Sequence, residues 1–292
     1  MSRRKRKKKP NPPGWWASLD AARRRRVVYG TLGAVGAVLL CASGSIAVSR
    51  LEAHVERAQW RAFPGARVVF VDLPSSLESL ALADLNGAVE GLMDGAWTDP
   101  KLCRRLAERV AGVGWVERVH HVRLSSDATF RISADYRRPI AMVQQGTGFL
   151  LVDRHAVRLP GSYRYDAAWL LIRGVAAPAP TAGVGWNGED VRAGLAVLAL
   201  IHDQPFTRQI TAVLVDNFGG RLDRLASHIE LATDRAGGRI RWGSAPGREF
   251  EENTPVEKLA LLNANFAGTG RCDAGYPVID VSTYPDRFTV PK

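Results

Sequence analysis

Cysteine is scarce in this chain, which has only three among its 292 residues: Cys41, Cys103 and Cys272. Thiols so few and so far apart exclude the disulfide-rich scaffolds of small secreted domains. Cys103 and Cys272 fall in parts of the sequence that we assign to different domains. We therefore expect both to be unpaired and to behave as small apolar core residues.

Recognisable catalytic motifs are missing as well. The sequence holds no G-x-S-x-G and no H-E-x-x-H, and Gly219-Gly220 is not followed by the lysine and helix of a phosphate-binding loop. His120 and His121 are adjacent on a predicted strand, so they point to opposite faces and cannot bind one metal together. We expect one of them in the core and one on the surface. These absences predict a protein that is not an enzyme and that uses no metal or cofactor.

Charge is missing from the stretch between Val27 and Val48. At about 1.5 Å per residue, a helix of this length crosses a hydrocarbon core of about 30 Å. Four arginines at 23–26 come directly before it, and such charge holds its end of a membrane helix in the cytoplasm. The sequence predicts a single-pass protein of the inner (plasma) membrane, cytoplasmic at its N-terminus and extracytoplasmic after Arg50. A small-x-small site at 45–47 leaves cleavage of the segment open.

The excess of positive charge lies almost wholly in the tail. The formal net charge is +11, and residues 1–26 hold 11 Lys and Arg against one acid, Asp20. Subtracting these from the 40 basic and 29 acidic residues of the chain leaves 29 and 28, so the outer part is nearly neutral. A nucleic-acid-binding domain would carry the excess itself. We therefore expect no nucleic-acid partner and interpret the tail as a topology signal that touches anionic lipid.

Two regions with different patterns follow the membrane segment. Residues 66–138 read as strand, helix, helix, strand and strand, with strict polar and apolar alternation at 129–136. Residues 139–292 are richer in strands and predict hairpins about Arg154-His155 and across 234–238, an amphipathic helix at 190–202, and a final strand at 277–284. The five expected segments are a basic tail (1–26), a transmembrane helix (27–48), a linker helix (49–65), a first domain (66–138) and a β-rich domain (139–292). The fold class is α+β.

The layout resembles the FtsQ/DivIB family of bacterial cell-division proteins. The similarity rests on the order and spacing of short motifs rather than on any single one, and it covers nearly the whole chain. The motifs are Gly114-Trp115-Val116-Glu117-Arg118-Val119, the segment from Phe130 to Ala141 with Arg137-Arg138-Pro139, Leu150-Leu151-Val152-Asp153, Glu257-Lys258-Leu259, and Val278-Ile279-Asp280-Val281.

The resemblance implies a POTRA domain at 66–138, a β-domain at 139–292, and a non-enzymatic scaffold of the divisome that bridges division proteins at the septum. It also implies partners like FtsB/DivIC and FtsL, together with other divisome components. The chain departs from the family pattern at Asp135-Tyr136, where Glu-Arg is usual, at Ser282-Thr283-Tyr284, where Arg-Tyr is usual, and in extra loop material around 174–188. These departures indicate a divergent member.

The last strand is the predicted partner site. An edge strand offers unpaired N–H and C=O groups to a partner strand, and the resemblance implies that use here. Side chains would alternate between the two faces, and Tyr284 is the best single contact because aromatic residues are enriched in binding hot spots. The predicted partner-binding residues are Ile279, Asp280, Val281, Ser282, Thr283 and Tyr284.

Two other classes of function stay open at this point. One is a membrane-anchored cell-envelope enzyme or glycan-binding module, against which the missing acid pair and nucleophile motif weigh. The other is a POTRA-type chaperone of envelope proteins, which would normally show several repeats and a barrel.

Overall fold

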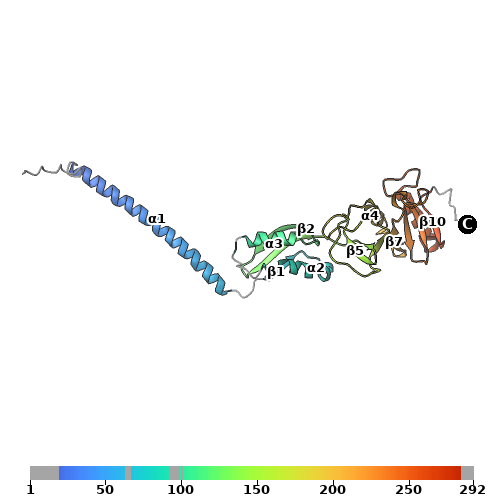
Figure 1. Ribbon diagram of the computed structural model, residues 1–292, viewed down its shortest axis with the longest axis horizontal. Coiled ribbons are helices and arrows are strands. Elements are labelled where there is room, and N and C mark those ends of the chain that lie inside the picture. The colour runs from blue at the N-terminus through green and yellow to red at the C-terminus, as the bar shows by residue number, and fades with distance from the viewer. Residues whose placement is uncertain (1–19, 63–66, 93–98, 100, 284–292) are drawn as a thin grey trace, which may run out of the picture. The chain divides into compact units, whose positions relative to one another are not determined.

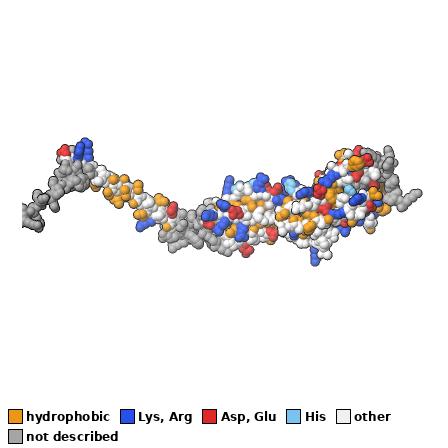
Figure 2. All heavy atoms as spheres, turned by 45° about the horizontal axis from the view of Figure 1, so that its top comes forward, with side chains coloured by type: hydrophobic (Ala, Val, Ile, Leu, Met, Phe, Trp, Pro, Cys, Tyr) orange, Lys and Arg blue, Asp and Glu red, His pale blue; other side chains and the backbone are white. Residues whose placement is uncertain are grey.

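The computed structural model describes residues 20–62, 67–92, 99 and 101–283, in two compact units divided between Pro64 and Gly65. The first unit contains one long helix, α1, Ala21–Ala62 (Figure 1). The expected membrane and linker segments are therefore continuous. Its Val28–His54 part is long and apolar enough to cross a membrane. Hydrophobic side chains are exposed along this helix (Figure 2). Tyr29 and Leu40 are among the large ones, and a bilayer would cover such a surface.

The second unit opens with a three-stranded sheet and two helices, in the predicted order. The strands are arranged β1-β3-β2, with β1 parallel and β2 antiparallel to the central β3. The elements are β1 (Arg67–Val71), α2 (Ser75–Val89), α3 (Leu102–Ala111), β2 (Val116–Leu124) and β3 (Thr129–Tyr136).

The alternation along β3 builds the core of this sheet. Phe130 and Ile132 are fully buried in one cluster with Leu85 of α2 and Leu106 of α3, whereas Arg131 between them is exposed. This is the face predicted from the period of two. The side chains of both helices thus pack against the same face of the central strand.

Ile132→Ala is expected to lower the free energy of unfolding by about 2–5 kcal/mol, because it leaves a cavity in this core. Urea unfolding of the chain in detergent, followed by tryptophan fluorescence, measures the change. Arg131→Ala on the same strand is the matched control and should cost far less. Equal effects of the two substitutions would contradict the assigned core face.

The remainder of the unit is a mixed seven-stranded sheet of order β10-β9-β8-β7-β6-β4-β5. Strands β4, β6 and β7 run parallel, as do β9 and β10, and the other pairs are antiparallel. The strands are β4 (Ala141–Gln145), β5 (Gly148–Val152), β6 (Leu170–Arg173), β7 (Ile210–Leu214), β8 (Ile229–Thr233), β9 (Arg239–Gly243) and β10 (Val278–Asp280), with helices α4 (Glu189–Ile201) and α5 (Pro255–Thr269).

One predicted hairpin forms only in part. The chain turns at Arg154-His155 and returns antiparallel to β5 through the bridge between Val152 and Arg158, but the regular ladder of β5 is made with β4. The carboxylate of Asp153 accepts hydrogen bonds from the backbone N–H groups of His155 and Val157, both at 2.8 Å, and folds the segment into a turn. The backbone N–H of Arg158 then donates to the carbonyl of Val184. The segment 156–159 thus lies between β5 and the chain at 184–185 and is joined to each of them by an isolated bridge.

Three other local predictions in this sheet are confirmed. The β8–β9 hairpin forms as expected. The sequence Thr254-Pro255-Val256-Glu257 predicts a capping box, and α5 begins there: the Thr254 side chain accepts from the Glu257 N–H and the Glu257 carboxylate accepts from the Thr254 N–H. Val191, Leu195, Leu198 and Ile201 recur at helical spacing in the sequence, which predicts that they face the core, and α4 buries all four.

Candidate partner-binding edge

Strand β10 lies at an open edge of the seven-stranded sheet and pairs only with β9 among the described residues. The Arg239 N–H donates to the Pro277 carbonyl at 2.8 Å, and the Val281 N–H donates to the Arg241 carbonyl at 3.1 Å. In a parallel pair, alternate residues bond to the neighbour. The backbone groups of Val278 and Asp280 therefore point away from the sheet.

The side chains of this segment face two environments. Ile279 and Val281 are 4% and 0% exposed and belong to the core that α4 and α5 cover. A partner therefore cannot reach these two side chains, and the Val281 backbone is already bound to Arg241 and Asn253. Ser282 is half-buried and Thr283 is exposed, while Tyr284 lies outside the described residues.

The strand ends sooner than the sequence predicts. The Asp280 carboxylate accepts from the Ser282 backbone N–H at 2.9 Å and from the Ser282 hydroxyl at 2.6 Å, which is the turn that an aspartate side chain favours. Asn253 then binds the backbone carbonyls of residues 281–283. Its backbone N–H donates to the Ser282 carbonyl at 2.8 Å, and its side-chain amide donates to the carbonyls of Val281 and Thr283. The edge open to a partner is thus limited to 278–280.

An ion pair between the half-buried Glu252 and the fully buried Lys258 lies directly beside Asn253. The preceding residue, Glu252, accepts a 2.9 Å hydrogen bond from the ammonium of Lys258, whose side chain is fully buried and lies 5.3 Å from the centre of the Trp242 ring. Glu252 also accepts from the backbone N–H and the hydroxyl of Ser244. Burial raises the pKa of Glu252, but the hydrogen bonds from Ser244 and Lys258 outweigh it and leave the pKa below its usual value.

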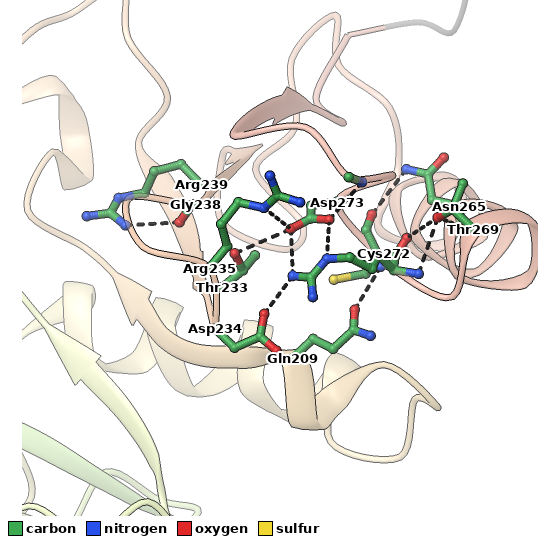
Figure 3. A network of polar contacts seen from close by, with 12 residues as sticks. Gln209, Thr233, Asp234, Arg235, Gly238, Arg239, Asn265, Thr269, Cys272 and Asp273 are labelled. Atoms are coloured by element: carbon green, nitrogen blue, oxygen red, sulfur yellow. Dashed lines mark hydrogen bonds and ion pairs between the residues drawn. The ribbon is translucent and has the colours of Figure 1, made fainter.

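A second polar cluster precedes β10 and is centred on Asp273 (Figure 3). The fully buried carboxylate of Asp273 accepts two 2.8 Å hydrogen bonds from the Arg271 guanidinium, which also binds Asp234 in the β8–β9 turn at 2.6 Å. The Gly275 N–H adds a third bond at 2.9 Å. The bonds from Arg271 lower the pKa of Asp273 against the opposing effect of burial. The cluster fixes the segment that leads into β10 against the hairpin beside it.

The cysteines have no partner. Cys41, Cys103 and Cys272 are all free, as expected. Burial raises the pKa of the Cys272 thiol to about 11, so this residue is a protonated core group at neutral pH.

The histidine prediction is wrong in one respect. His120 and His121 are both exposed, because irregular pairing between Val119 and His121 interrupts the alternation of β2. The imidazole of His120 lies 3.0 Å from the Asp135 carboxylate. In the part of the chain that the structure describes, no group of three or more His, Cys, Asp or Glu side chains is arranged to hold a metal ion.

No known family profile and no curated protein matches this chain. The geometry of the edge is therefore the main guide to function. Three residues that define it, Asn253, Lys258 and Asp273, were not among the predicted site residues. Of these, Lys258 could have been noticed, because it lies four residues before the buried Leu262 on the core side of α5.

Proposed function

We propose that this protein is a non-enzymatic, membrane-anchored scaffold of the bacterial division machinery, of the FtsQ/DivIB type. The observation that carries the proposal is the open edge at β10, a surface that recognises a partner through its backbone. In this proposal α1 crosses the inner membrane once, the basic tail is cytoplasmic, and residues 65–292 are extracytoplasmic at the division site. The order of motifs in the sequence supports the assignment.

Two structural features support the individual parts of the proposal. The three-stranded sheet with order β1-β3-β2 and two helices is compatible with a POTRA domain at 66–138. The seven-stranded sheet ends in a strand whose outer N–H and C=O groups bond to none of the described residues and could accept a further strand. The proposed partner is a small single-pass coiled-coil protein like FtsB/DivIC, itself paired with an FtsL-like protein.

Val278→Pro is expected to weaken capture of this partner by about tenfold or more. The substitution removes an outward N–H group, and a lost hydrogen bond together with an unsatisfied partner carbonyl costs about 1–3 kcal/mol. The fold should survive, because proline is tolerated as the first residue of an edge strand when its nitrogen faces outward. Co-purification with the coiled-coil protein encoded in the same genome measures the effect.

Val278→Ala is the matched control, because it removes the side chain and keeps the N–H group. Proline at Val281 is unsuitable, since it deletes the bond to Arg241 that belongs to the fold itself. In dividing cells, a fluorescent fusion of the chain should form a septal ring, and Val278→Pro should abolish the partner's ring while its own remains. A chain that never gathers at the septum would overturn the proposed function, and normal partner recruitment by Val278→Pro would overturn the assignment of the edge.

A further inference from the structure

An apolar groove lies on the same sheet, away from its β10 edge. It has a volume of about 900 Å³ and is formed where the parallel strands β4, β6 and β7 begin and where helix α4 ends. Its apolar lining includes Trp169, Leu170, Leu198 and Ile210. The groove is therefore built from three neighbouring interior strands and one covering helix.

The charged residues of the groove are all basic. Arg138 and Arg208 line it together with His202, and no Asp or Glu is among its lining residues. All three side chains are exposed. Neither arginine forms an ion pair with any of the described residues. The groove thus combines an apolar floor with two exposed arginines, of which Arg138 also borders a neighbouring hollow that is lined by Asp72, Glu117, Asp135 and Asp153.

The two arginines of the groove do not bind the backbone carbonyls at the C-terminal end of helix α4. A helix C-terminus leaves carbonyls that attract cations, but here other groups bind them. The Gln204 side-chain amide donates to the Leu200 carbonyl at 3.3 Å, and the Thr207 hydroxyl, with its single proton, lies within hydrogen-bond distance of the carbonyls of Ile201, His202 and Gln204. The guanidinium groups of Arg138 and Arg208 therefore stay available to an external anion.

The type of occupant follows from the backbone around the groove. Each of β4, β6 and β7 is paired on both sides, so the groove has no free strand edge to which a strand could be added. A helix satisfies its own backbone groups and binds through its side chains. We infer that the groove receives an acidic amphipathic helix of a partner protein, with apolar side chains on the floor and carboxylates at the arginines. This contact is separate from the strand pairing proposed for β10.

The test uses the full chain in nanodiscs of zwitterionic phosphatidylcholine. The probe is a fluorescent peptide of about 18 residues, above the length at which isolated helices are marginal, with leucine at every third or fourth position, glutamate at the positions facing the arginines and alanine elsewhere. A second peptide carries lysine in place of each glutamate. Fluorescence anisotropy should show saturable binding of the acidic peptide that weakens with salt, and much weaker binding of the lysine peptide.

Arg138→Glu combined with Arg208→Glu should weaken binding of the acidic peptide by about tenfold or more. The matched control is Arg192→Glu, an exposed charge reversal on α4 that does not line the groove and should change affinity less than about twofold. Ala199→Trp fills the groove without altering charge and should also block binding. If the double charge reversal lowers the melting temperature, Ala199→Trp still tests whether the peptide binds in the groove.

The inference fails if the two peptides bind equally, if Arg192→Glu is as damaging as the double reversal, or if Ala199→Trp binds normally. It also fails if only nanodiscs containing phosphatidylglycerol bind through Arg138 and Arg208, since the surface would then recognise lipid. Val278→Pro should bind the acidic peptide normally, which keeps this test independent of the β10 edge.

Discussion

Glu252→Ala is expected to lower the free energy of unfolding by about 3–5 kcal/mol, because it leaves the ammonium of Lys258 buried without a counter-ion. Lys258 is fully buried, and Glu252 is its only hydrogen-bond acceptor in the part of the chain that the structure describes. The neighbouring Trp242 ring at 5.3 Å offsets only part of the cost. Urea unfolding of the chain in detergent, followed by tryptophan fluorescence, gives the difference.

The double variant Glu252→Ala with Lys258→Met distinguishes the cost of an unpaired buried charge from the cost of lost side-chain packing. Replacing both partners of a buried ion pair by apolar groups is often neutral, so the double variant should recover most of the lost stability. The exposed pair of Arg248 and Glu189, at 3.1 Å, provides the control, and Glu189→Ala should cost less than about 1 kcal/mol. If the double variant were as unstable as Glu252→Ala, the ion pair would not be the source of the effect.

The ion pair also bears on the proposed binding edge. Glu252 directly precedes Asn253, which binds the carbonyls of residues 281–283. A chain that loses the pair should release these carbonyls and lengthen the open edge beyond Asp280. The segment Glu252-Asn253, between β9 and α5, therefore affects both the stability of the fold and the length of the open edge.

Much of the fold could be predicted from local patterns, because the relevant interactions are close in sequence. The alternation at 129–136, the turn between β8 and β9, and the capping box at Thr254 each involve residues a few positions apart. Strand β4 was missed since Ala141, Met142 and Val143 are all buried and show no alternation. A strand covered on both faces carries no period of two.

The candidate site was predicted less completely, and the reason is physical. The sequence identified a terminal edge strand, but its length is set by Asn253, which lies 28 positions from Val281. The buried charges at Lys258 and Asp273 likewise depend on partners whose proximity only the folded sheet creates. An Asp-x-Ser pattern at 280–282 was the one local signal for the early end of the strand.

Asp273→Asn is the second substitution with a large expected effect, and that effect depends on pH. At neutral pH it should cost about 3 kcal/mol, since a buried carboxylate that accepts two bonds from Arg271 and one from Gly275 is replaced by a neutral amide. The folded-state pKa of Asp273 lies below its usual value because of Arg271. The native state therefore binds fewer protons than the unfolded chain, and this contribution is fully present above about pH 4.

As the pH falls from about 4 through the lower folded-state pKa of Asp273, this contribution is lost. Urea unfolding of the wild-type chain and of Asp273→Asn at several pH values measures the difference in their unfolding free energies. This difference should be large at neutral pH and should become smaller as the pH falls. Glu252, whose pKa is also lowered, is present in both chains and cancels from the comparison. Asp166→Asn, an exposed aspartate in a loop turn, is the control and should show a small gap at every pH. If the difference in unfolding free energy between the wild type and Asp273→Asn did not change at acidic pH, the charge of Asp273 would not contribute to stability. The cluster in Figure 3 would then stabilise the segment before β10 through packing and uncharged hydrogen bonds only.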